Sequence, residues 1–201
     1  MAVYSYFISM MLTIMSNFTH RIRVPVLILV ALMSRASVVS AACASVPDQN
    51  GNVNIEAGTT TIAFNAFQNC ETLKTIYFPA SLLEIYAQAF SGSSLTTVTI
   101  ETGSNLHTVG LKAFANSALA SFTAPTGLIN IGISAFQQTK LTSFVIPNTV
   151  KSVGSQAFSY CDFLKTVSIE SGSTLEKIES YVFSCSTLFD TFVVPASVSS
   201  I

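Results

Sequence analysis

The sequence predicts a solenoid built mostly of β-structure, in which stacked copies of one repeat form a parallel sheet. An Ala-Phe pair recurs along the chain, and the steps from Phe to Phe are 23, 24, 22, 22 and 25 residues. Apolar residues occupy fixed places before and after each Phe, in register from one copy to the next. Half of the residues are apolar and only 9% are charged, so the composition allows a continuous buried core.

The repeat is visible as columns of equivalent residues. The aromatic column contains Phe67, Phe90, Phe114, Phe136, Phe158 and Phe183. Five residues before each Phe stands a β-branched residue, at Ile62, Ile85, Val109, Ile131, Val153 and Ile178. One unit has about five apolar side chains and nothing to bury them against, so we expect the units to stack and to join these side chains into ladders.

Each unit is expected to begin with a strand. Its last positions alternate, so Ile76 should face the core while Thr75 and Tyr77 face solvent. Proline ends this strand in four units because it has no N–H for the ladder, and these prolines are Pro79, Pro125, Pro147 and Pro195. Two units have a longer turn instead, at residues 101–105 and 170–174. The segment around each Ala-Phe pair is predicted to be a short helical or irregular turn.

The start of the chain differs in character from the rest. Residues 1–44 contain three Arg and no acid, whereas residues 45–201 contain six Lys and ten acids. A basic start, a short apolar run and small residues before Ser45 are typical of a secretory signal, with cleavage expected between Ala41 and Ser45. A retained N-terminal anchor is the alternative, although the apolar run is shorter than the roughly 20 residues that cross a bilayer. We therefore divide the chain into a leader, 1–44, and a repeat array of about seven coils, 45–201, truncated in the last coil.

The clearest unit has the pattern of a known family. Residues 141–158 read Leu-x-x-Phe-x-Ile-Pro-x-x-Val-x-x-Val-Gly-x-x-Ala-Phe. This pattern strongly resembles the BspA-like (Treponema pallidum type) leucine-rich repeat, and the resemblance covers about residues 50–201. It implies an α/β-type leucine-rich-repeat solenoid, mostly β, that forms a curved right-handed superhelix with one parallel sheet and short helical or irregular turns opposite. It also implies a secreted or cell-surface protein that binds or adheres. A regular Asn after the strand is missing, and only Asn148 stands near that place.

No catalytic constellation is evident in the sequence. The two His are His20, in the leader, and His107, and no Ser or Cys stands at a spacing that suggests a nucleophile with its base. The clustered Lys and Arg of nucleic-acid-binding proteins are missing, and the net charge is −1. One carboxylate in each longer turn, Glu101 or Glu170, is far below the about six to eight oxygens that calcium takes. We therefore expect a non-enzymatic protein without metal or cofactor that does not bind nucleic acid.

Three cysteines follow the aromatic column. Cys70 and Cys161 stand three residues after a column Phe, where other units have Ser93, Ser117 and Thr139, and Cys185 stands two residues after one. One interpretation is a buried slot for a small side chain. The other is a disulfide between Cys161 and Cys185, which stacked coils of an exported protein would bring within bonding range.

The outward strand positions form two columns rich in hydroxyl groups. The candidate binding residues are Thr75, Tyr77, Thr97, Thr99, Ser121, Thr123, Ser143, Thr166 and Thr191. A broad, weakly polar sheet suits contact with a partner, and Tyr77 is the only aromatic residue in the second outward column. We therefore expect a secreted or cell-surface protein that binds a protein or glycan ligand through this sheet, near Tyr77.

Two further functions stay open at this point. The repeats could be the recognition arm of a larger receptor or enzyme whose effector domain lies beyond residue 201. They could also form a self-associating structural protein, because an open solenoid end offers an unpaired sheet edge. A membrane anchor, through the leader or a missing C-terminus, is compatible with each of these functions.

Overall fold

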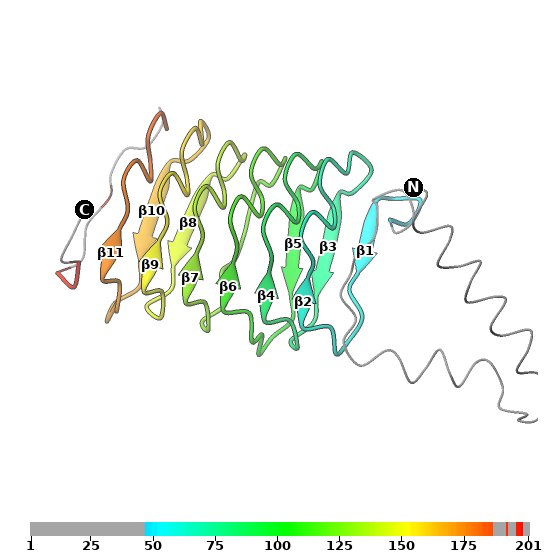
Figure 1. Ribbon diagram of the computed structural model, residues 1–201, viewed down its shortest axis with the longest axis horizontal. Coiled ribbons are helices and arrows are strands. Elements are labelled where there is room, and N and C mark those ends of the chain that lie inside the picture. The colour runs from blue at the N-terminus through cyan, green and yellow to red at the C-terminus, as the bar shows by residue number, and fades with distance from the viewer. Residues whose placement is uncertain (1–46, 187–191, 193–195, 199–201) are drawn as a thin grey trace, which may run out of the picture. The chain divides into compact units, whose positions relative to one another are not determined.

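The structure is a computed structural model that describes residues 47–186, 192 and 196–198, and its coils stack into a parallel β-solenoid (Figure 1). The strands lie on two faces. The first face carries β1 (Asn52–Asn54), β3 (Thr75–Phe78), β5 (Thr97–Ile100), β8 (Ser143–Ile146) and β10 (Thr166–Ile169). The second face carries β2 (Thr61–Ile62), β4 (Glu84–Ile85), β6 (Thr108–Val109), β7 (Asn130–Ile131), β9 (Ser152–Val153) and β11 (Lys177–Ile178).

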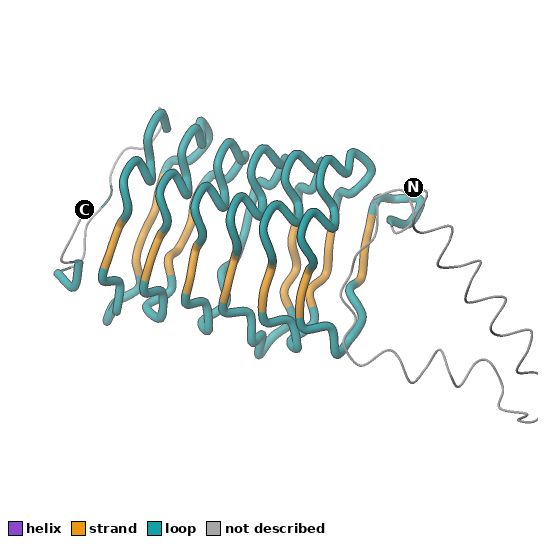
Figure 2. Tube along the Cα trace, viewed as in Figure 1, coloured by secondary structure: helices purple, strands orange, loops and turns teal. Residues whose placement is uncertain are grey.

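The two faces differ in continuity. The second face is one sheet of six strands in the order β11-β9-β7-β6-β4-β2. The first face is divided into a three-stranded sheet, β1-β3-β5, and a two-stranded sheet, β10-β8. The coil between them makes a single isolated bridge, from Ser121 to Thr97. Figure 2 shows the strands as two rows that are joined by turns at both ends.

The second row of strands was not predicted. The sequence predicted one strand in each coil, whereas most coils in the structure have two. Each strand of the second row is two residues long and has a buried apolar residue, such as Ile85 or Val109, as its second member. Two residues are too few for an alternating pattern to be recognised in a sequence. The column of β-branched residues was the only sign of this sheet.

The aromatic column forms a stack inside the solenoid, as predicted. Consecutive rings from Phe67 to Phe158 are nearly parallel, with centroids 5.2, 5.1, 5.4 and 5.4 Å apart. Phe122 and Phe144, from the first face, contact this stack at tilted angles. The β-branched column is buried beside it. The core is therefore continuous from coil to coil.

The segment around each Ala-Phe pair consists of tight turns, and the described residues contain no helix, including none that could span a membrane. In each coil the residues two before and two after the column Phe have positive φ: Asn65, Asn69, Gln88, Gly92, Lys112, Asn116, Ser134, Gln138, Gln156, Tyr160, Tyr181 and Cys185. This conformation costs about 1–2 kcal/mol for a residue other than glycine. Hydrogen bonds between coils offset the cost: the amides of Lys112, Phe114 and Asn116 donate to carbonyl oxygens of the next coil at 2.9, 2.8 and 2.8 Å.

Candidate binding surface

The outward columns of the first face lie at the surface over most of their length. Two predicted binding residues, Thr75 and Tyr77, are half-buried, and Thr191 lies outside the described residues. The exposed ones are Thr97, Thr99, Ser121, Thr123, Ser143 and Thr166. These side chains are uncharged, so the face offers hydroxyl groups together with the exposed apolar side chain of Val145.

Tyr77, the predicted contact for a partner, already has a partner within the protein. Its hydroxyl interacts with the carboxylate of Glu101 in the next coil. Burial, and then the negative charge of Glu101, raises the pKa of the Tyr77 hydroxyl. Thr75 likewise donates a hydrogen bond to Oδ1 of Asn52. The exposed hydroxyl groups of the later coils are therefore the more accessible part of the first face.

Glu101 and Glu170 connect each longer turn to the preceding coil. Oε2 of Glu101 accepts a hydrogen bond from the amide of Ala80 at 2.7 Å, and Oε2 of Glu170 accepts one from the amide of Asn148 at 3.1 Å. Ala80 and Asn148 each directly follow the proline of their own coil. Each carboxylate therefore holds its turn against the proline turn of its neighbour.

The residue after each strand also decides how far the ladder extends. The amides of Glu101 and Glu170 donate to the preceding coil at 3.0 Å each, and four residue pairs join β3 to β5 and β8 to β10. Pro125 and Pro147 occupy this position in the two intervening coils and have no N–H to donate. The ladder fails at both junctions, and the missing N–H contributes to this division of the first face. It does not act alone, because Pro79 stands at the same place and β1 and β3 are still joined by three residue pairs.

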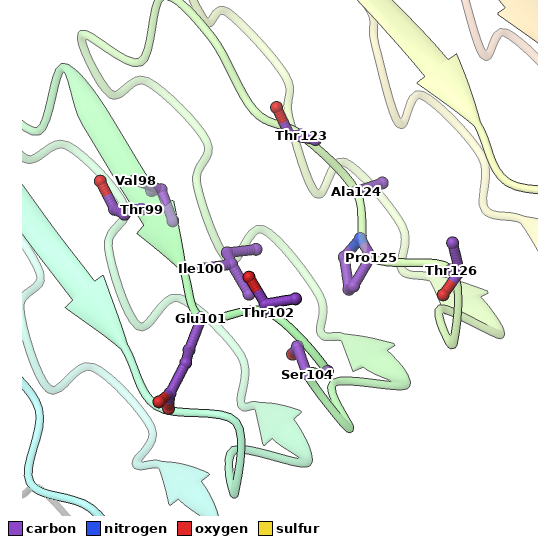
Figure 3. Close-up of a pocket in the computed structure, with 11 residues that line it drawn as sticks. Val98, Thr99, Ile100, Glu101, Thr102, Ser104, Thr123, Ala124, Pro125 and Thr126 are labelled. Carbon is purple, nitrogen blue, oxygen red and sulfur yellow. The ribbon is translucent and has the colours of Figure 1, made fainter.

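A groove opens on the first face where the ladder fails, between β5 and residues 121–126 (Figure 3). Its volume is about 550 Å³, and its walls include Val98, Thr99 and Ile100 on one side and Thr123, Ala124 and Pro125 on the other. Ala124 stands where the neighbouring coils have Ile100 and Ile146, so its small side chain leaves space. The groove lies within the predicted binding face, but the sequence analysis did not identify it.

A second surface that the sequence analysis missed lies on the second face. Its exposed apolar side chains are Phe64, Tyr86, Leu111, Ile129 and Ile133. Leu111 and Ile133 each follow a glycine that fits closely against the preceding coil, and a Cβ atom on Gly132 would lie 2.6 Å from the backbone of Gly110. A signal was present for three of them, because Phe64, Leu111 and Ile133 stand two places after the β-branched column.

The structure corrects the predicted disulfide between Cys161 and Cys185, because both thiols are free. Cys185 stands one place earlier in its coil than Cys161, so Ser186 lies beside Cys161 instead, and the Cys161 amide donates to Oγ of Ser186 at 3.3 Å. The Cys161 thiol donates to the carbonyl oxygen of Phe136 at 3.1 Å, and burial raises its pKa. Cys161 therefore occupies the buried small-residue slot, the first of the two interpretations of the sequence.

Cys70 stands at the equivalent place of its own coil but has a different covalent state. It is buried and disulfide-bonded.

The groups that could support metal or acid–base chemistry are dispersed. In the part of the chain that the structure describes, no three His, Cys, Asp or Glu residues gather in a way that could hold a metal ion. Nδ1 of His107 lies 3.0 Å from Oγ1 of Thr108, its neighbour in sequence. The partner of the imidazole in this contact is therefore a hydroxyl group of β6 and not a carboxylate.

Comparison with known proteins places this solenoid in a family. The family model for the BspA type leucine rich repeat region matches residues 47–165 and 100–201, with six copies. The chain belongs to this family. The resemblance drawn from residues 141–158 is thereby confirmed, and so is the leucine-rich-repeat solenoid.

Two solved structures of leucine-rich repeat proteins share the fold. A leucine-rich repeat protein from Bacteroides ovatus is 26% identical with a TM-score of 0.60, over 73% of this chain and 46% of that one. One from Eubacterium ventriosum is 19% identical with a TM-score of 0.58, over 63% of this chain and 34% of that one. The T. pallidum leucine-rich repeat protein is 21% identical with a TM-score of 0.45, over 61% and 74%. The chain thus spans less than half the length of the first two, and a comparison with curated proteins found no match.

Proposed function

We propose that this BspA-type leucine-rich-repeat chain is a secreted or cell-surface protein that binds a protein or glycan ligand through its first face, without catalysis. The observation that carries the proposal is the run of exposed, uncharged hydroxyl side chains from Thr97 to Thr166. The inward side chains of the same strands are used by the core, whereas these outward ones are accessible to a partner. Extended surfaces of stacked repeats are the usual binding surfaces of solenoid proteins.

Export is supported by the signal-like leader and by the disulfide at Cys70, since structural disulfides persist in oxidising compartments. Expression with the native leader, followed by mass spectrometry of the product, tests this proposal. We expect an exported chain that begins between Ala41 and Ser45. A product that stays in the cytosol would refute export, and an exported one that begins at Met1 would refute cleavage.

The binding face is tested with an array of purified glycans and extracellular proteins. Thr99→Lys and Thr166→Lys place a charge on the first face, whereas Lys112→Ala changes the turn side of the solenoid and is the control. For any probe that the wild type binds, we expect the two face variants to bind at least about tenfold more weakly, a loss of about 1.4 kcal/mol. Intact binding by both face variants, together with loss in Lys112→Ala, would move the site to the turns. A wild type that binds no probe would contradict the proposed function.

A further inference from the structure

The groove on the first face exposes a strand edge in the middle of the solenoid. β5 pairs with β3 along one edge through four residue pairs. Along its other edge a single bridge joins Thr97 to Ser121, and no further pair follows toward Ile100. Within the described residues, no backbone hydrogen bond has the amide of Thr123, the equivalent of Thr99 in the next coil, as its donor. Both walls of the groove therefore offer peptide groups that are not used inside the protein.

The geometry keeps this edge open. Pro125 has no N–H with which to close the ladder onto β5, and Ala124 leaves the space that a larger side chain fills in neighbouring coils. The second face holds the same two coils together, because β6 and β7 stay paired through Thr108 and Asn130. The opening is thus a stable feature of one face and does not need the coils to separate.

We propose that this groove binds an extended peptide segment of a partner protein, which adds to the free edge of β5 by backbone hydrogen bonds and places a small apolar side chain beside Ala124. This inference rests on the proposed binding role of the first face and names the chemistry of its partner. Addition of a strand to an exposed sheet edge is an established mode of peptide recognition, in which main-chain bonds give affinity and side-chain pockets give specificity.

The lining favours a peptide over other ligands. The unused groups are amides and carbonyls spaced along a strand, and another strand supplies the complementary set. The groove volume of about 550 Å³ lies within the range of about 300–1,000 Å³ that is usual for ligand sites. Its one charged lining residue, Glu101, points away from the opposite wall (Figure 3) and accepts a hydrogen bond from Ala80. The lining contains no aromatic ring on which a sugar could stack, so a neutral peptide fits best.

The test uses a synthetic peptide that copies residues 164–171 of this chain, Leu-Lys-Thr-Val-Ser-Ile-Glu-Ser, with blocked ends and a fluorescent label. This segment contains β10, which already pairs in parallel with another strand of the first face. Its matched control is the same peptide methylated on the backbone nitrogens of its Thr, Val and Ser, which keeps every side chain and removes central donors. We expect the control to bind the wild-type protein at least about tenfold more weakly in fluorescence anisotropy.

Two protein variants locate the site. Ala124→Ile fills the groove and should weaken peptide binding at least about tenfold. Val145→Ile adds a single methylene group at an exposed position of the next coil, outside the groove, and should leave binding unchanged. Circular dichroism confirms that both variants are folded. Peptide binding should also slow amide hydrogen exchange at Val98, Ile100 and Thr123.

Three results would overturn the inference: no binding of the peptide by the wild type, equal binding of the methylated control, or unchanged binding by folded Ala124→Ile. A glycan that competes for the groove, with the peptide inactive, would also reject a peptide as the occupant. These failures leave the array signals of the first face as they are. Conversely, the Thr166→Lys variant could bind the array probes as tightly as the wild type while the peptide still binds in the groove. That result would reject the broader proposal for the first face and leave the groove proposal standing.

Discussion

Replacement of Phe136 by alanine should be one of the most destabilising single changes in this solenoid. The side chain is fully buried, and its ring has four aromatic neighbours at 5.2–5.4 Å: Phe114, Phe122, Phe144 and Phe158. Loss of a buried Phe to Ala costs about 3–5 kcal/mol. Aromatic pairs contribute about 0.5–1.5 kcal/mol each beyond area burial, which places this site at the upper end. We therefore expect the free energy of unfolding to fall by about 4–5 kcal/mol.

Urea unfolding followed by circular dichroism measures this change, with the disulfide kept intact. Phe163→Ala is the matched control because Phe163 is 51% exposed, and we expect its effect to stay within about 0.5 kcal/mol. If Phe136→Ala were no more destabilising than Phe163→Ala, the aromatic stack would not be what holds the coils together. A change in the dependence of the unfolding free energy on urea, without a change in the urea midpoint, would also contradict a simple cavity effect.

Two further changes test the turns. Glu101→Gln removes the charge that faces Tyr77, so the pKa of the Tyr77 hydroxyl should fall toward its ordinary value of 10.0 in an ultraviolet titration, and an unmoved pKa would contradict the contact. The raised pKa also makes the stability of the wild type depend on pH. Its contribution to folding is fully present below pH 10 and is lost as the pH rises through the pKa of Tyr77 in the folded protein. Lys112→Gly removes about 1–2 kcal/mol of left-handed strain from the folded state. Glycine also favours the unfolded state by about 0.5–1 kcal/mol of backbone entropy, so thermal melts should show a stability that is unchanged or higher by up to about 1 kcal/mol. Ala113→Gly, at a buried position without positive φ, should destabilise the protein, and equal effects of the two glycines would refute the turn geometry.

Much of the fold was predictable because each coil repeats the same apolar spacing. The inward places of Phe136 and Ile76 follow from column position and strand alternation, and both residues are buried. The outward places of Thr97 and Thr166 follow from the same alternation, and both are exposed. A repeated pattern averages out the local ambiguity that makes a single short strand hard to recognise.

The rest depends on features that spacing does not carry. Left-handed turns are usually signalled by Gly or Asn, but here Lys112 and Tyr160 adopt them because bonds between coils hold the backbone. The predicted disulfide failed through an offset of one residue, which aligns Cys161 with Ser186. Aligning residues by their distance from the column Phe does not separate neighbouring positions in a turn. In the structure the side chains of neighbouring turn positions point in different directions.

The residue that ends each strand connects the sequence to the candidate site. Glutamate supplies an amide for the ladder and a carboxylate for the preceding turn, as Glu101 does for Ala80, whereas proline supplies neither. In this chain two successive coils end their first-face segment with proline, at Pro125 and Pro147. The segment that contains Ala124 is therefore unpaired on both sides over most of its length. The groove therefore lies beside residues that contribute little to the buried columns, and the repeated core spacing alone does not predict its position.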